Sequence, residues 1–138
     1  MTRADLIELV GVPWRLGGRS LEGLDCLGLV LECCHRDRIE MCDVWATWKQ
    51  AYASGWRDFE LAIPPGWEFI ELSMLGRGAV LVLEADDLPC HLAYVLSGSR
   101  VLTTTSATGA VSLPMCSVWK RIRSALHAIP PARRGAAC

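Results

Sequence analysis

Cys26 differs from the other cysteines of the chain in its position. It follows a glycine-rich stretch and Asp25, a residue type that suits a helix N-cap, so its thiol is predicted to lie in the first turn of a helix. Unpaired backbone N–H groups and the helix dipole at that end favour the thiolate, which is the nucleophilic form of cysteine. The position indicates a nucleophile, although a cysteine at a helix N-terminus is by itself more often inert.

His91 is the natural partner for such a thiol. It begins a predicted strand 65 residues further along the chain, where its ring could accept the thiol proton and return it to a leaving amine. Alternation along the strand puts His91 on the face shared by Ala93 and Val95. If that face meets the helix, His91 lies at the strand end nearest the helix N-terminus. The competing interpretation, a strand-end histidine satisfied by backbone groups, stays open.

The first half of the chain supplies the helices that would carry the thiol. Residues 2–10 are predicted to be helical with Thr2 as the cap, and the glycines and proline of residues 11–20 predict an ordered loop. A second helix begins near Asp25, with apolar side chains at helical spacing: Leu27, Val30, Leu31 and Cys34. A third helical segment, rich in tryptophan, is predicted over residues 43–58.

Beyond a break at residues 63–66, the hydrophobic pattern changes to that of strands. Apolar and β-branched runs predict strands at 79–83, 91–96 and 101–105, turns at 84–89 and 97–100, and a further strand near 110–122 that has Trp119 in it or just after it. Helices followed by an antiparallel meander predict an α+β fold. Residues 1–129 are predicted to form one domain, and residues 130–138 a mobile tail.

The composition limits the classes of function. Hydrophobic residues make up 51% of the 138 residues and charged residues 21%, which suits a folded domain with a real core. The formal net charge of −1 gives no support for nucleic-acid binding. No apolar run is long enough to span a bilayer, and the first residues lead into no signal-type stretch. Membrane insertion and export through a signal peptide are therefore not expected.

The seven cysteines form no obvious metal site or disulfide framework. Their number is odd, no CxxC pair occurs and a secretory signal is lacking. Cys33, Cys34 and Cys42 could contribute to a metal or iron–sulfur site, but adjacent thiols on one helix diverge by about 100°. Small buried hydrophobes are the alternative, and neither a metal nor another cofactor is expected.

The order of these motifs resembles the NlpC/P60 family of cysteine peptidases, and most closely its phage-tail and prophage cell-wall branch. The resemblance rests on Gly11-Val12-Pro13-Trp14, Gly17-Gly18, Gly23 and Asp25-Cys26-Leu27-Gly28-Leu29-Val30, followed by His91-Leu92-Ala93-Tyr94-Val95-Leu96 and Ser97-Gly98. It covers residues 5–35 and 76–114. The glycine and Asp-Cys block is specific, whereas the histidine strand is weaker alone but correctly placed.

The resemblance implies a papain-like α+β fold and hydrolysis of peptide bonds in peptidoglycan stem peptides, commonly next to D-γ-glutamyl. It implies that Cys26 is the nucleophile and His91 the base. Asp25 would help to bind the substrate amine, and Trp14, in place of the usual tyrosine, would line the site. Backbone N–H groups at the helix start, including that of Cys26, would hold the oxyanion.

Two positions depart from the family's pattern. The residue after the nucleophile is usually serine and here is Leu27, which removes one polar contact with the substrate. The family places a His, Asn or Gln on the next strand to orient the imidazole, whereas the corresponding residue here, 12 after His91, is Thr103. A threonine hydroxyl can accept a hydrogen bond from the ring, but it is short and neutral, so a slow enzyme or a fold without activity is implied.

Three hypotheses follow. The first is a phage-tail cysteine peptidase that opens peptidoglycan during infection, made in the host cytoplasm and carried by the virion. The second is a structural tail-tip or tail-assembly protein on the same fold, docked to other tail-tip or baseplate proteins, with tryptophans serving that interface or the core. The third is a thiol hydrolase of a small amide unrelated to the cell wall. The Cys26–His91 pair favours the first hypothesis, and Thr103 the second.

Overall fold

The computed structural model describes residues 1–44, 63–85 and 88–130, and its N-terminal part carries two helices and a hairpin. Helix α1 (Arg3–Leu9) starts with a capping box formed by Thr2 and Asp5. Strands β1 (Arg19–Ser20) and β2 (Gly23–Leu24) form the hairpin, and helix α2 (Cys26–Arg36) follows directly. No helix within the described ranges is long and apolar enough to cross a membrane.

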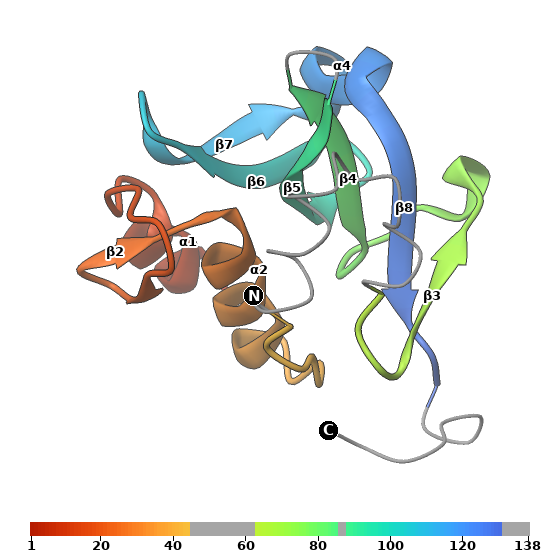
Figure 1. Cartoon of the computed structure of the whole chain (residues 1–138), viewed down its shortest axis with the longest axis horizontal. Helices are drawn as coiled ribbons and strands as arrows, with labels where there is room; N and C mark the ends of the chain where they lie inside the picture. Colours follow the sequence, from red (N-terminus) through yellow and green to blue (C-terminus); the bar gives the residue numbers. More distant parts are fainter. Residues whose placement is uncertain (45–62, 86–87, 131–138) are drawn as a thin grey trace.

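A six-stranded antiparallel sheet makes up the rest of the described fold (Figure 1), with its strands in the order β3-β8-β4-β5-β6-β7. The strands are β3 (Trp67–Ile70), β4 (Val80–Ala85), β5 (Leu88–Ser97), β6 (Arg100–Thr105), β7 (Gly109–Pro114) and β8 (Ile122–Ala128). Three short helical elements lie between them, namely η2 (Leu72–Met74), α4 (Met115–Val118) and η3 (Trp119–Arg121). Helix α2 packs on β5 and β6.

The two faces of the sheet bury two separate apolar clusters. The first is shared with α2 and contains Leu27, Leu29, Val30, Cys33 and Cys34 of the helix with Val80, Val82, Leu92, Tyr94, Leu102 and Leu126 of the sheet. The second lies on the opposite face and contains Leu81, Leu83, Ala93, Val95 and Val101 with Met115 and Val118 of α4. Because both faces are covered, the central strands are apolar at nearly every position rather than at every second one.

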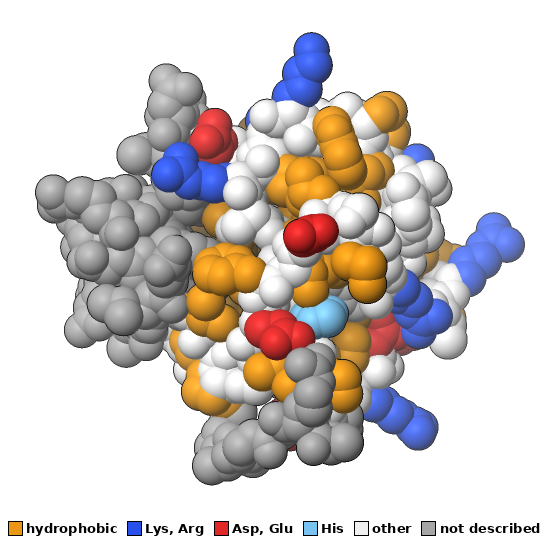
Figure 2. All heavy atoms as spheres, turned by 90° about the vertical axis from the view of Figure 1, so that its right-hand side faces the viewer, with side chains coloured by type: hydrophobic (Ala, Val, Ile, Leu, Met, Phe, Trp, Pro, Cys, Tyr) orange, Lys and Arg blue, Asp and Glu red, His pale blue; other side chains and the backbone are white. Residues whose placement is uncertain are grey.

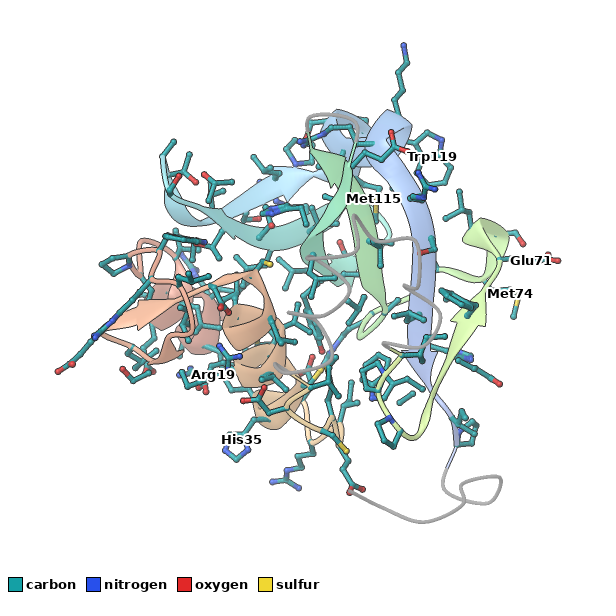
Figure 3. The ribbon with its side chains drawn as sticks, viewed as in Figure 1. Arg19, His35, Glu71, Met74, Met115 and Trp119 are labelled. Atoms are coloured by element: carbon teal, nitrogen blue, oxygen red, sulfur yellow. The ribbon has the colours of Figure 1, made fainter. Side chains whose placement is uncertain are left out.

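Exposed apolar side chains gather on the side of the molecule that carries β3 and β8. They are Phe69, Leu72, Met74 and Trp119, from β3, η2 and η3. Figure 2 shows apolar side chains over this side, and Figure 3 places Met74 and Trp119 there, away from α2.

The main elements predicted from the sequence are confirmed. The helix over residues 2–10 is α1 with Thr2 as its cap, and the helix from Asp25 is α2 with Asp25 as its cap. The strands predicted at 79–83, 91–96 and 101–105 are β4, β5 and β6, although β5 begins earlier, at Leu88. The α+β class, with helices before an antiparallel meander, is confirmed.

The chain after β6 differs from the prediction of one strand over residues 110–122. Strand β7 ends at Pro114, and α4 and η3 then turn the chain back. Strand β8 inserts between β3 and β4 and pairs with both. The sequence did not indicate β8 because Arg123, Ser124 and His127 interrupt its apolar residues, and tertiary pairing decides its structure.

Helix α2 is buried more widely than the predicted stripe. Leu27, Val30 and Cys34 are buried as expected, but Leu29 and Cys33 are also fully buried. The helix packs against the sheet and also against β1 and β2, so one apolar stripe does not cover its contacts. From residue 45 onward the helical segment predicted at 43–58 lies outside the described residues, as does most of the tail predicted at 130–138. The single domain over 1–129 stays a prediction.

Candidate active site

Asp25 fixes the first turn of α2, where Cys26 is the first helical residue. Its Oδ1 accepts hydrogen bonds from the Gly28 amide at 2.7 Å and the Arg19 guanidinium at 3.0 Å, and its Oδ2 accepts one from the Gly17 amide at 2.8 Å. Cys26 is a partly buried thiol rather than half of a disulfide. The helix end that favours a thiolate is therefore held rigidly by three donors.

Three glycines let the loop before α2 pack directly against its first turn. A Cβ on Gly28 would lie 2.2 Å from the carbonyl oxygen of Gly18, and a Cβ on Gly18 would lie 2.2 Å from that of Gly23. A Cβ on Gly23 would lie 2.6 Å from the Cβ of Arg15. None of these separations leaves room for a methyl group, so the glycine block exists for close packing. That packing brings the Gly17 amide to the Asp25 carboxylate.

The register of β5 and β6 brings His91 and Thr103 into contact. The Thr103 hydroxyl donates its proton to the backbone oxygen of Leu92 at 2.7 Å. The same hydroxyl lies 2.7 Å from His91 Nε2. A hydroxyl has one proton to donate, so at His91 it must accept, and Nε2 carries the ring proton. Nδ1 is then the unprotonated nitrogen, which is the form that can act as a base.

Burial and a nearby cation both act on the His91 ring. Burial lowers the pKa of His91, and the positive charge of Arg121 at the end of η3 lowers it further. Arg121 lies just before Ile122, which pairs with Leu83, and Leu83 in turn pairs with His91. The imidazole is therefore neutral at pH 7 and ready to take a proton.

The loop that precedes the thiol is tied to the strand next to β6. The Gly11 amide donates to the Ala110 oxygen at 2.8 Å, and the Ala110 amide donates to the Val12 oxygen at 2.9 Å. Together with the packing of α2 on β5 and β6, these bonds hold the two parts of the site in one body.

The face of β5 that meets α2 is the opposite of the one considered from the sequence. Leu92 and Tyr94 join the cluster shared with α2, whereas Ala93 and Val95 join the cluster on the other face. The condition stated for His91, that the face it shares with Ala93 and Val95 meets the helix, is therefore not met. Both faces of β5 are buried, so alternation of polarity could not tell them apart.

The two residues predicted to bind substrate lie in different environments. Trp14 is 38% exposed and forms a bridge with Leu24, directly before Asp25. Asp25 is 3% exposed, and both of its oxygens accept hydrogen bonds within the protein. The structure thus shows Asp25 as a helix cap, and its binding of a substrate amine stays a prediction.

Cys33 and Cys34, further along α2, lack the features of Cys26. Burial raises the pKa of the Cys34 thiol to about 12, and burial raises that of Cys33 further. Both therefore stay protonated, as expected for small buried hydrophobes. Among the described residues, no group of three His, Cys, Asp or Glu side chains could hold a metal ion. Cys42 is disulfide-bonded, which the sequence argument against a disulfide framework did not anticipate.

Two arginines that act on the site were not predicted from the sequence. Arg19 donates a hydrogen bond to Asp25, and the positive charge of Arg121 lowers the pKa of His91. Arg19 follows the Gly-Gly pair directly, which was a signal that it lies near the helix start. Nothing in the pattern around Arg121 indicated its place, because it depends on the unpredicted insertion of β8.

Two solved structures that match this chain are described as NlpC/P60 proteins. One is the NlpC/p60 domain of the peptidoglycan hydrolase SagA, with a TM-score of 0.56 and 17% identity over 88% of this chain and 92% of that one. The fold is that of an NlpC/P60 domain. Another is an NLP/P60-family protein, described as similar to lipoprotein, from Staphylococcus aureus subsp. aureus Mu50, with a TM-score of 0.60 and 17% identity. The match covers 91% of this chain and 39% of the staphylococcal one.

No family model and no curated protein matches the sequence. The papain-like α+β fold predicted from the sequence is confirmed by the structural likeness. At 17% identity that likeness shows the fold alone, so the activity has to be argued from the residues of this chain.

Proposed function

We propose that the chain is a cysteine peptidase that hydrolyses peptide bonds in peptidoglycan stem peptides, with Cys26 as nucleophile, His91 as general base and Thr103 as the residue that orients His91. The observation that carries the proposal is the His91–Thr103–Leu92 hydrogen-bond chain, because it leaves His91 Nδ1 as a base. The NlpC/P60 fold supports the choice of reaction, since a structural neighbour is described as a peptidoglycan hydrolase.

The reaction proceeds in two halves. His91 takes the proton of the Cys26 thiol, and the thiolate attacks the carbonyl carbon of the scissile peptide bond. Backbone N–H groups at the start of α2 hold the oxyanion while His91 gives its proton to the departing amine. Water, deprotonated by His91, then attacks the thioester, which releases the new carboxylate and restores the Cys26 thiol.

Thr103 is expected to make the hydrolysis slow. Its hydroxyl keeps Nε2 as the protonated nitrogen, but it is neutral and stabilises the imidazolium less than a charged or strongly polar partner would. This specific feature favours a second candidate function, a structural component of a phage tail tip built on the same fold. A weak orienter reduces the rate without removing the nucleophile or the base.

Incubation with muropeptides and intact sacculi tests the peptidase. Purified protein, with Cys26→Ser and His91→Ala as matched variants, is assayed for released amines and for fragment masses. Cleavage by the wild type and by neither variant is the expected result, and the fragment masses identify the bond. If the wild type cleaves neither muropeptides nor sacculi, the proposed peptidase is wrong and the structural candidate takes its place.

The proposal extends to a phage tail as the place of action. Its support is the sequence block from Gly11 to Val30, which resembles the phage-tail and prophage branch of the family. The protein is expected in the virion, made in the host cytoplasm, beside tail-tip or baseplate proteins. Mass spectrometry of gradient-purified particles tests this, and recovery of the protein only from the cell lysate would contradict it.

A further inference from the structure

Asp25 brings an electrostatic cost to the end of the helix that carries the nucleophile. Its carboxylate caps α2 by accepting the Gly28 amide at 2.7 Å, and it is adjacent in sequence to Cys26. A negative charge beside a thiol disfavours the thiolate, which opposes the effect of the helix dipole. An aspartate cap therefore stabilises the helix and works against its nucleophile.

Arg19 supplies the opposing charge at the same carboxylate. Its Nη1 donates to Asp25 Oδ1 at 3.0 Å and to the Gly18 oxygen at 2.8 Å. Its Nε and Nη2 donate to the two oxygens of Asp43, at 2.9 Å and 3.3 Å. The side chain lies alongside α2 (Figure 3) and is 27% exposed. The Arg19 guanidinium thus links the carboxylate of Asp25, at the start of α2, to that of Asp43, which follows the helix in the chain.

The guanidinium stays charged in this setting. Burial acts to lower the pKa of Arg19, but the hydrogen bond with Asp43 and the charges of Asp25 and Asp43 raise it overall. Besides Arg19, Asp25 and Asp43, the segments packed around the start of α2 carry other charged or titratable groups, namely Arg15, Glu22 and His91. On α2 itself, Glu32, His35 and Arg36 lie more than one turn beyond Cys26.

We propose that Arg19 is a positioning residue that offsets the charge of Asp25 and thereby keeps Cys26 reactive. The inference rests on the proposed function in taking Cys26 as the nucleophile, but it concerns the reactivity of the thiol and needs no peptide substrate. It assigns the residue after the Gly-Gly pair a role in tuning the nucleophile rather than in contacting substrate.

The pH dependence of Cys26 alkylation tests the proposal. Iodoacetamide is used from pH 5 to pH 9 on full-length protein carrying Cys116→Ser, so that the exposed thiol of Cys116 does not compete, and the modified peptide is quantified by mass spectrometry. Arg19→Gln should move the midpoint of the profile to higher pH and slow alkylation at pH 6.5 about tenfold. Asp25→Asn should move the midpoint to lower pH, because asparagine caps a helix as well as aspartate without the charge.

The double variant Arg19→Gln/Asp25→Asn separates charge from packing. With both charges removed, its profile should return close to that of the wild type. A double variant as slow as Arg19→Gln, or an Arg19→Gln profile equal to the wild type, would overturn the proposal. Arg19→Lys, which keeps the cation, should keep the midpoint even where Arg19→Gln fails to fold. Asp43→Asn is the matched control, since it leaves the cation on Asp25 and should not slow alkylation.

The two proposals can fail separately. Expected alkylation profiles without muropeptide cleavage would keep the role of Arg19 and reject the peptidase. Muropeptide cleavage that depends on Cys26, combined with unchanged profiles in Arg19→Gln, would keep the peptidase and reject the role of Arg19.

Discussion

Each end of α2 holds an aspartate whose side chain is buried, and the two ends are built in different ways. At the first end, Asp25 accepts two backbone amides and Arg19. At the other end, Asp37 accepts hydrogen bonds from the hydroxyl of Tyr94, the guanidinium of Arg77 and the N-terminal ammonium, and its side chain is 3% exposed. Backbone donors and glycines thus shape the end that carries Cys26, whereas side chains of distant segments hold the end that carries Cys33 and Cys34.

The first end of α2 is therefore suited to a reactive thiol, and the second end to packing in the core. The first end exposes helix amides and dipole to a thiol, and the loop around it tolerates no side chain at Gly18, Gly23 or Gly28. The second end places Cys33 and Cys34 in the apolar core, where burial raises the pKa of both thiols. Of these three cysteines on one helix, one is placed to react and two are placed to pack.

The largest expected effect is at the glycine that joins the loop to the first end. Gly28→Ala would place a methyl group 2.2 Å from the Gly18 oxygen, and neither backbone can yield easily. Unfolding in urea should show a loss of more than about 3 kcal/mol. Gly76→Ala is the control, because a Cβ there meets nothing within 4 Å, and equal losses in the two variants would contradict the account.

The next effect is at the other end of the helix. Asp37→Ala leaves the buried hydroxyl of Tyr94 without its acceptor, and should cost about 2 kcal/mol of unfolding free energy. Burial acts to raise the pKa of Asp37, but hydrogen bonds from the N-terminus, Tyr94 and Arg77 hold it below its usual value of 3.8. The stabilisation is therefore present above pH 3.8 and is lost as the pH falls through the folded-state pKa.

Asp37→Ala also tests whether the two ends of α2 are independent. Because Asp37 lies eleven residues after Cys26, at the far end of α2, its loss should leave the rate of Cys26 alkylation unchanged at a temperature where the protein stays folded. A rate that falls in proportion to the lost stability would show that the two ends are not independent.

A smaller effect is expected where His91 is oriented. Thr103→Val keeps the shape of the side chain and removes the hydroxyl that accepts from His91 Nε2. The kcat for muropeptide cleavage should fall about tenfold with little change in KM. Thr103→His, which introduces a residue type that the NlpC/P60 family resembled by this sequence carries at that position, should raise kcat. No change of kcat in either variant would rule out Thr103 as the orienting residue.

The smallest effect concerns the cation near His91. Burial and Arg121 lower the pKa of His91, so the acid limb of kcat/KM should lie below the usual histidine value of 6.5. A base must be neutral to act, so activity is lost as the pH falls through that pKa. Arg121→Gln should move the limb toward 6.5. A limb unmoved by this change would mean that burial alone sets the pKa of His91.

Local patterns predicted the parts of the site that depend on neighbouring residues. The Asp25 cap follows from helix N-terminal preferences, whereas Thr103 was expected only from the resemblance, which implies an orienting residue 12 positions after His91; in the sheet Thr103 pairs with Ala93. Arg19 could not be predicted as a partner of Asp25 and Asp43, because the contact depends on the three-dimensional path of the glycine loop. The face of β5 and the insertion of β8 were missed for a related reason, since both depend on which surfaces the whole fold buries.

Selective labelling of the wild-type protein tests the central claim, that α2 carries one reactive and two inert thiols. Native protein is treated with limiting iodoacetamide at pH 6.5, digested, and the labelled fraction of Cys26, Cys33 and Cys34 is measured by mass spectrometry, with Cys116 as the exposed reference thiol. Cys26 is expected to be labelled well before Cys116, and Cys33 and Cys34 only after unfolding. Labelling of Cys26 no faster than Cys116, or together with Cys33 and Cys34, would contradict it.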